Sequence, residues 1–228
     1  MTLKILYEDN HVIAVQKPHG MLVQSDGTAD ATLINEVRYF LKQRDNKPGS
    51  VFLGLVHRLD RPVGGVVVFG KTSKGAARLS EQFRVHSVEK VYWAVVQTLP
   101  LNKGESEGVV TQWLVKDEDR NVVKAFDHEA LGSQFAETAW KVLYPVKDER
   151  FLVEVKPETG RPHQIRVALA SLSMPIYGDM KYGSPSAIAL PNGSTALALM
   201  ARSLSFDQTV TKERITVVAE PQLECFYA

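Results

Sequence analysis

The sequence predicts an α+β fold with a mixed, mostly antiparallel sheet flanked by helices. Segments typical of strands outnumber those with helical spacing, and several follow one another with only short polar turns between them. That succession favours antiparallel neighbours over the strand–helix alternation of a doubly wound parallel sheet. Neither an internal repeat nor a low-complexity tract interrupts the pattern.

Strands are predicted wherever apolar residues alternate or β-branched residues cluster. Residues 3–17 are expected to form two short strands joined at Glu8-Asp9-Asn10 and stopped by Pro18 and Gly20. The run "VVVF" at 66–69 is typical of a buried strand. Further strands are expected at 89–96, 109–115, 138–146, 150–157, 195–206 and 214–220.

Three segments show the spacing of a helix. Residues 31–45 place five apolar side chains on one face: Leu33, Ile34, Val37, Phe40 and Leu41. The segment that follows Lys71 is predicted to begin at a Thr72 or Ser73 cap and to stay helical through Phe83. Residues 163–172 form the third expected helix.

Length and composition indicate one globular domain over residues 1–228. Hydrophobic residues make up 44% and charged residues 23% of the 228 residues, as in ordinary soluble domains. The N-terminus lacks the pattern of a secretory signal, and the longest apolar runs are too short to span a bilayer. Since the chain has one cysteine, Cys225, it cannot form an internal disulfide. We therefore expect a cytoplasmic enzyme or binding protein.

The charge is unevenly distributed along the chain. Residues 57–90 contain seven Lys and Arg against three Asp and Glu, which gives +4 within a chain of net charge +1. A local basic region on a nearly neutral protein suits an anionic ligand bound at one place. From charge alone, however, a solvated helix face is the more common explanation.

Several familiar sites are missing from the sequence. It contains no phosphate-binding loop, no dinucleotide-binding glycine motif and no nucleophile elbow. The six histidines show none of the close spacings of a zinc site. We therefore expect neither a cofactor nor a metal.

The first polar cluster is "HRLDR", residues 57–61, which precedes a glycine pair and a buried strand. A carboxylate at Asp60 would lie at the edge of a sheet, where Gly64 and Gly65 permit a close backbone approach. The alternative is that Asp60 only caps the turn and pairs with Arg58 or Arg61.

The second polar cluster is "KPETGRPHQIR", residues 156–166. Cations and backbone N–H groups at a helix N-terminus form an anion site, although an exposed, charged helix start would look the same. If Arg166 reached Asp60, the ion pair would keep that carboxylate ionised. Because no second carboxylate stands beside Asp60, glycoside hydrolysis is disfavoured. The second cluster comprises Arg161, His163, Gln164 and Arg166.

At these residues the chain resembles the RluA family of RNA pseudouridine synthases. The family signature His-Arg-Leu-Asp-x-x-Thr-Ser-Gly is similar to "HRLDRPVGG" at 57–65. Four other family motifs match in order: "VIAVQKPHGMLV" (12–23), "EKVYWAVV" (89–96), "TGRPHQIRV" (159–167) and "PIYGDMKYG" (175–183).

The resemblance implies an isomerase that converts uridine in tRNA or ribosomal RNA to pseudouridine without a cofactor. By their places in the motifs, Asp60 would be the catalytic carboxylate, Tyr92 would pack on the target base and Arg166 would pair with Asp60. Whether Asp60 attacks the substrate or abstracts a proton at C2′ stays open. A non-catalytic RNA-binding relative is the alternative. The expected RNA contacts are His57, Arg58, Arg61, Arg161, His163 and Gln164.

The chain departs from the family pattern at a few positions. Val63 and Gly64 replace Thr and Ser after the catalytic motif, which removes two hydroxyl groups. Ala168, Ser173 and Met200 also differ from the usual residues. We expect no S4 RNA-binding domain, so that substrate choice would lie with the catalytic domain of a monomer.

Overall fold

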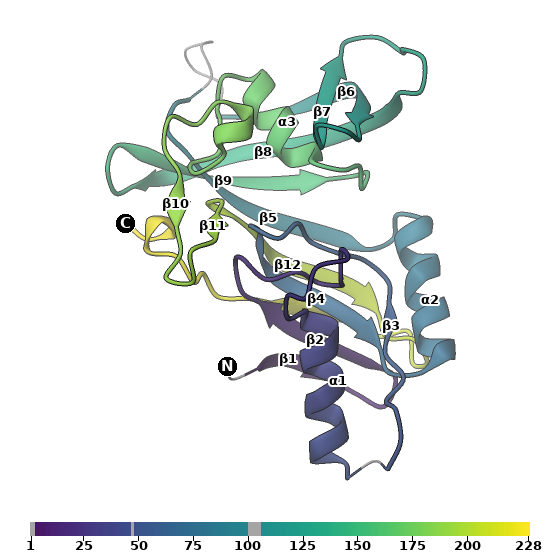
Figure 1. The fold of residues 1–228 in the computed structure, drawn as a ribbon. Helices are drawn as coiled ribbons and strands as arrows, with labels where there is room; N and C mark the ends of the chain where they lie inside the picture. Colours follow the sequence, from purple (N-terminus) through teal and green to yellow (C-terminus); the bar gives the residue numbers. More distant parts are fainter. Residues whose placement is uncertain (1–2, 47, 100–105) are drawn as a thin grey trace. The chain divides into compact units, whose positions relative to one another are not determined.

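The computed structural model describes residues 3–46, 48–99 and 106–228. The chain divides into two compact units (Figure 1). The first unit comprises Met1–Glu89 and Ala201–Gln222, and the second comprises Lys90–Met200 and Leu223–Ala228. Organisation as a single domain over 1–228 stays a prediction.

The first unit is built on a sheet whose central strands are fully buried. Its hydrogen-bonded order is β1-β2-β4-β12, with β3 paired to β4 and β13 paired to β12. The pairs β1/β2, β2/β4, β3/β4 and β12/β13 are antiparallel, as predicted. Every residue of β2 and β4 is buried, which accounts for their near-continuous apolar runs. The bounds are β1 Lys4–Glu8, β2 Val12–Lys17, β3 Gly54–Leu55, β4 Gly64–Gly70, β12 Leu199–Asp207 and β13 Arg214–Val218.

The predicted turn between the first two strands forms around Asp9. Its carboxylate oxygen Oδ1 accepts hydrogen bonds from the backbone N–H groups of His11 (2.6 Å) and Val12 (2.7 Å). A side chain that bonds the backbone two and three residues onward stabilises a tight turn. Asp9 therefore sets the antiparallel return of β2 along β1.

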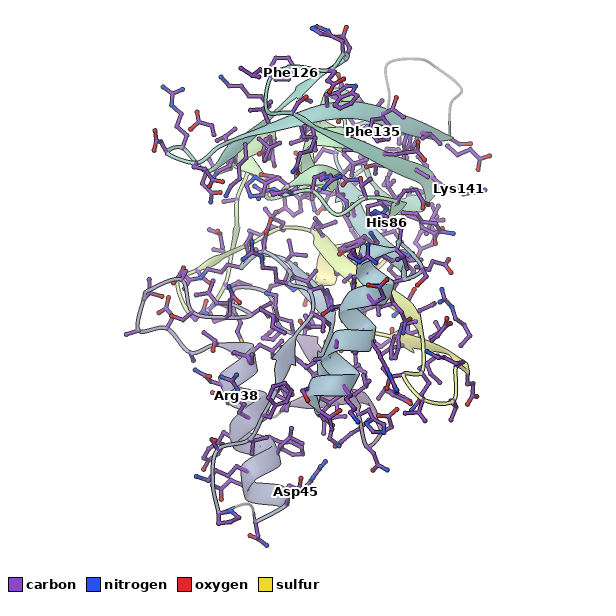
Figure 2. All side chains as sticks on the ribbon, turned by 90° about the vertical axis from the view of Figure 1, so that its right-hand side faces the viewer. Arg38, Asp45, His86, Phe126, Phe135 and Lys141 are labelled. Atoms are coloured by element: carbon purple, nitrogen blue, oxygen red, sulfur yellow. The ribbon has the colours of Figure 1, made fainter. Side chains whose placement is uncertain are left out.

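Both helices of the first unit occur where the apolar spacing predicts them. Helix α1 (Leu33–Arg44) is marked by Arg38 and Asp45 in Figure 2. Helix α2 (Ser73–Arg84) starts after Thr72, whose Oγ1 accepts a hydrogen bond from Gly75 N at 3.1 Å and confirms the predicted cap. The α1 residue Phe40 is only partly buried, and the Arg44 guanidinium lies 5.2 Å from its ring.

The second unit contains a five-strand ladder covered by helix α3 (Gln164–Ser171). The order is β5-β9-β8-β6-β7, and every neighbouring pair in it is antiparallel. On the α3 side, Leu114, Val123, Ala136 and Val167 form a buried cluster. The bounds are β5 Glu89–Val96, β6 Glu107–Asp117, β7 Val122–Phe126, β8 Gln134–Val146 and β9 Arg150–Pro157.

Aromatic side chains occupy the opposite face of the same ladder. Trp113 lies directly across from Phe126 on one side and Phe135 on the other, so the three rings share one face. Phe126 and Phe135 are labelled in Figure 2. The alternation of Trp113 with the buried Leu114 is the period of two expected of a strand.

Several elements differ from the sequence prediction. Strand β7 was not predicted, because its five residues form too short a pattern to separate from a loop. The single strand expected at 195–206 is instead β11 (Thr195–Ala196), which pairs with β10 (Ile188–Ala189), followed by β12. The break occurs because the Ala198 backbone bonds Val95 N and Tyr177 O, at 2.8 and 2.9 Å. Two short 3-10 helices, η1 (Met180–Tyr182) and η2 (Glu224–Phe226), complete the unit.

Among the described residues, no helix is long and apolar enough to cross a membrane.

Gly65 is expected to be intolerant of any side chain. Its φ is +115°, and a Cβ there would lie 2.5 Å from the backbone nitrogen of Ala201. Gly65→Ala should therefore lower the free energy of unfolding by about 3 kcal/mol or more, through backbone strain and overpacking. Gly49→Ala is the matched control, since a Cβ at Gly49 meets nothing within 4 Å. Equal denaturation midpoints for the two variants would contradict this assignment.

Candidate functional site

The HRLD segment, residues 57–60, alternates between anchored and exposed side chains. His57 Nε2 accepts a hydrogen bond from Val68 N in β4 at 3.0 Å, and its ring stacks on Phe83 of α2 with centroids 4.7 Å apart. Leu59 is buried, whereas Arg58 and Asp60 are exposed. His57 and Leu59 thus fix the segment to the sheet and to α2, while Arg58 and Asp60 face solvent.

Lys17, at the end of β2, holds the loop that follows Asp60. Its side chain is fully buried, and Nζ donates to the carbonyl oxygens of Pro18 (3.1 Å), Met21 (2.6 Å) and Arg61 (3.0 Å). Gly20 N also donates to Arg61 O at 2.9 Å. The peptide after Asp60 is therefore bound twice by residues 17–21.

Burial also changes the acid–base behaviour of Lys17. Loss of water lowers the pKa of its amine to about 7, and the nearby Asp60 carboxylate partly opposes that shift. Sequence patterns alone do not single out Lys17 as a site residue. The available signal was a lysine two positions after the apolar run 12–15, at the end of a strand that is buried on both faces.

The glycine pair has the role that the sequence suggested, a close backbone approach. A Cβ on Gly64 would lie 2.5 Å from His19 Nδ1, and Gly65 packs against the backbone of Ala201. Val63 N donates to Asp60 O at 3.1 Å, which closes a turn between the carboxylate and the glycines. This confirms the expected turn, with Asp60 at its start.

The two arginines that flank Asp60 have different surroundings. The Arg61 guanidinium pairs with Asp30, and both side chains are about half exposed. Arg58 is exposed, and in the described part of the chain its side chain has no hydrogen bond or ion pair. The Asp60 carbonyl closes the turn, and Arg61 forms an ion pair with Asp30.

In the second unit, Arg166 forms a buried bidentate ion pair with Asp179. Arg166 Nε and Nη2 lie 2.7 and 2.8 Å from the two Asp179 carboxylate oxygens. Asp179 is 1% exposed, and Arg166 packs its guanidinium 4.9 Å from the Tyr182 ring centroid. Two fixed donors and a stacked ring hold the guanidinium plane in one orientation.

Tyr182 links this ion pair to the start of α3 and to β7. Its hydroxyl accepts a hydrogen bond from Val123 N at 2.8 Å and shares another with His163 Nδ1 at 2.7 Å. His163 precedes α3 in the left-handed conformation, with φ 51°. Asp179 and Tyr182 both come from the "PIYGDMKYG" motif, whose individual residues the sequence analysis left without roles.

Gln164, an expected RNA contact, uses its whole amide within the protein. Oε1 accepts from Thr159 Oγ1 (2.7 Å) and Arg161 N (3.0 Å), while Nε2 donates to Glu137 O (2.8 Å) and Thr138 Oγ1 (2.9 Å). Four bonds fill the capacity of an amide side chain. The structure therefore favours a structural role for Gln164, in which it ties the Thr159-Gly160 turn to β8.

Arg161 and Tyr92 occupy other parts of the second unit. Arg161 Nε donates to Phe135 O at 3.1 Å, and its side chain lines a surface pocket together with Lys116. Tyr92 is partly buried on β5, opposite Val155 of β9. Tyr92 and Arg166 thus belong to one unit and Asp60 to the other, and their convergence stays a prediction.

Among the described residues, no group of three or more His, Cys, Asp or Glu side chains is arranged to hold a metal ion.

The first unit thus carries an exposed carboxylate, Asp60, on an anchored loop, and the second unit carries an oriented arginine, Arg166. Residues 11–171 match the family model described as RNA pseudouridylate synthase, so the chain belongs to the RNA pseudouridylate synthase family. It is accordingly a pseudouridine synthase, an intramolecular isomerase.

Curated relatives and solved structures are consistent with that membership. The chain is 35% identical to the tRNA pseudouridine synthase C of Haemophilus ducreyi, over 96% of this chain and 91% of the relative. It is 33% identical to the ribosomal large subunit pseudouridine synthase D of Zymomonas mobilis over 79% of this chain, but spans only 56% of that protein. The solved structure titled human RNA pseudouridylate synthase domain containing 4 is 26% identical, with a TM-score of 0.75 over 96% of this chain and 89% of that one. The pseudouridine synthase fold is therefore confirmed.

Removing the Asp179 carboxylate should strongly destabilise the second unit. Asp179→Asn removes the negative charge that faces two nitrogens of the buried Arg166 guanidinium, and removing one partner of a buried ion pair costs about 3 kcal/mol or more. Glu81→Gln is the control, because it breaks the exposed Glu81–Arg84 pair and should leave the melting temperature unchanged. Thermal unfolding followed by circular dichroism measures both. A melting temperature for Asp179→Asn equal to that of Glu81→Gln would show that the buried pair does not hold the fold.

Lys17 should make stability rise with pH above neutrality. Its pKa is about 7 in the folded chain against an ordinary 10.5, so between these values the unfolded chain binds more protons. The free energy of unfolding then increases from pH 7 towards pH 10. Lys17→Met should be less stable overall and should lose most of this rise, as urea denaturation across that range would show. The same slope in both proteins would contradict the assignment.

Proposed function

We propose that this chain converts uridine to pseudouridine in tRNA or ribosomal RNA, with Asp60 as the catalytic carboxylate. The observation that carries the proposal is an exposed carboxylate on an otherwise anchored loop. His57 secures the loop before Asp60, and the Arg61 carbonyl and Gly64 secure it after Asp60. A reacting group must be held in place yet reachable, and Asp60 meets both conditions.

The reaction is an isomerisation in which atoms balance without a second reactant. The N1–C1′ bond breaks, the uracil turns, a C5–C1′ bond forms, and the proton lost from C5 is balanced by one gained at N1. Asp60 would act on the ribose or the base directly, or as the base that removes the C2′ proton. Both routes need an ionised carboxylate.

Arg166 and Tyr92 are proposed to complete the site from the second unit. Asp179 holds the Nε and Nη2 side of Arg166. That Arg166 pairs with Asp60 stays a prediction. Tyr92 would pack its ring on the target base and assist proton transfer.

RNA is the proposed partner, and its target nucleotide must leave the stack to reach Asp60. The exposed Arg58 is the best-placed contact for the flipped nucleotide or the position it vacates. Arg61 and Arg161 are proposed backbone contacts, although Arg61 must share its charge with Asp30. For His57, His163 and Gln164, the hydrogen bonds within the protein support positioning of the loops over direct contact with RNA.

Transfer RNA is the first substrate to test. The relative that this chain covers almost completely is named a tRNA enzyme, whereas the ribosomal relative is spanned over only about half its length. We further propose that the protein acts in the cytoplasm, where its RNA substrates would be found. We also propose that it acts as a monomer.

Asp60→Asn should abolish modification while leaving the fold intact. Pseudouridine is mapped in total RNA from cells with the protein, without it, and with each variant reintroduced. At least one site should depend on the protein, and Asp60→Asn should lower its rate of formation by at least ~100-fold. Asp127→Asn, which alters a carboxylate that is 94% exposed, is the control and should restore the site. The proposal fails if no site depends on the protein or if Asp60→Asn restores every site.

A further inference from the structure

The space beside Gly64 is filled by the imidazole of His19. A Cβ built on Gly64 would lie 2.5 Å from His19 Nδ1 and 3.0 Å from Nε2, far inside van der Waals contact. His19 itself is 8% exposed, so its ring is packed between protein groups and cannot simply swing into solvent. The two residues are 45 positions apart in the chain, and one occupies the volume that the other lacks.

The neighbours of His19 already hold the loop that carries Asp60. Lys17 Nζ and Gly20 N both donate to Arg61 O, at 3.0 and 2.9 Å. These bonds secure the peptide that follows the carboxylate. The turn then continues from Asp60 O to Val63 N and reaches Gly64, where His19 packs. Residues 17–20 thus contact the loop at two places, at Arg61 within the turn and at Gly64 directly after it.

We propose that His19 is a positioning residue for Asp60, and that it replaces the side chain that the family signature carries at position 64. In the signature this position is Ser, and in this chain the imidazole of His19 supports the loop from the opposite segment. The inference rests on the proposed function only in taking Asp60 as the reacting carboxylate. The packing of His19 against Gly64 can be tested independently of any activity.

Because His19 fills the space beside Gly64, substitutions at positions 19 and 64 are expected to have coupled effects. Gly64→Ser alone would force its Cβ into the His19 ring and displace the loop. His19→Ala alone would leave a cavity and loosen the loop. In the double variant His19→Ala/Gly64→Ser, the serine enters the space that the imidazole has left, and the loop regains its support.

The test is a double-mutant cycle with two independent readouts. Melting temperatures of the full chain report the packing. Single-turnover rates at saturating RNA, with separate Kd measurements, report the position of Asp60. The substrate is the tRNA fraction, and in parallel the ribosomal RNA fraction, from cells that lack the protein. Gly49→Ser and His128→Ala are matched controls, because Gly49 faces open space and the His128 side chain is 77% exposed.

We expect Gly64→Ser to lower the melting temperature by about 5 °C and the single-turnover rate by about 100-fold, with little change in Kd. His19→Ala should lower the rate by a smaller factor, and it still tests the inference if Gly64→Ser does not fold. The double variant should exceed Gly64→Ser in both readouts. Both controls should behave as the unmodified protein.

Additive effects of His19→Ala and Gly64→Ser would overturn the inference. A Gly64→Ser variant with unchanged rate and stability would overturn it as well. A loss of RNA affinity without a loss of rate would assign His19 to binding and equally overturn it. Full activity in Asp60→Asn would overturn the proposed function instead, and the coupling in melting temperature would then still show whether positions 19 and 64 form a packed pair.

Discussion

The Asp60 loop of the first unit depends on the hydrogen bonds that the buried Lys17 ammonium group donates. It lies where a central strand ends, and its three N–H groups match three backbone carbonyls from two different segments. Without that match, the carbonyls of Pro18, Met21 and Arg61 would need other donors in a place that water reaches poorly. The lysine therefore joins the end of β2 to the Asp60 loop. The glycine pair at the start of β4 allows His19 to pack against Gly64 and the Ala201 backbone to pack against Gly65.

In the second unit, contacts with neighbouring side chains orient the guanidinium group of Arg166. An arginine side chain has many rotamers, and a single carboxylate on the surface would not select one of them. Asp179 binds two nitrogens of Arg166, and Tyr182 covers one face of its guanidinium. His163 and Val123 in turn fix Tyr182. Arg166 is thus oriented by Asp179 and by Tyr182 of η1, which is itself bonded to β7 and to the start of α3.

Much of the fold follows from local patterns in the sequence. Strands β2, β5 and β9 and helices α1 and α2 form where alternation, β-branched runs or helical spacing predict them, because these signals act within a few residues. The same reasoning missed β7 and merged β11 with β12. Their limits are set by partners distant in the chain, such as the bonds of Ala198 to Val95 and Tyr177.

The residues of the candidate site, too, can be predicted only in part from the sequence. The motifs identify Asp60 and Arg166 by residue type and spacing, but residue type does not say which polar groups are satisfied internally. Gln164 and His57 suggest RNA contacts in the sequence, yet in the structure their hydrogen bonds go to the protein's own backbone and side chains. Asp179 and Lys17 gain their importance from burial, which depends on the complete fold.

Tyr182 also contacts the edge of the sheet in the second unit. Strand β7 is the last strand of its ladder, and the end strand of a sheet presents backbone N–H groups on which a further strand can assemble. The Val123 N–H is taken by the Tyr182 hydroxyl, and η1 lies beside that edge. The phenol that packs on Arg166 therefore also occupies one N–H group of the end strand, where the backbone of a further strand could otherwise pair.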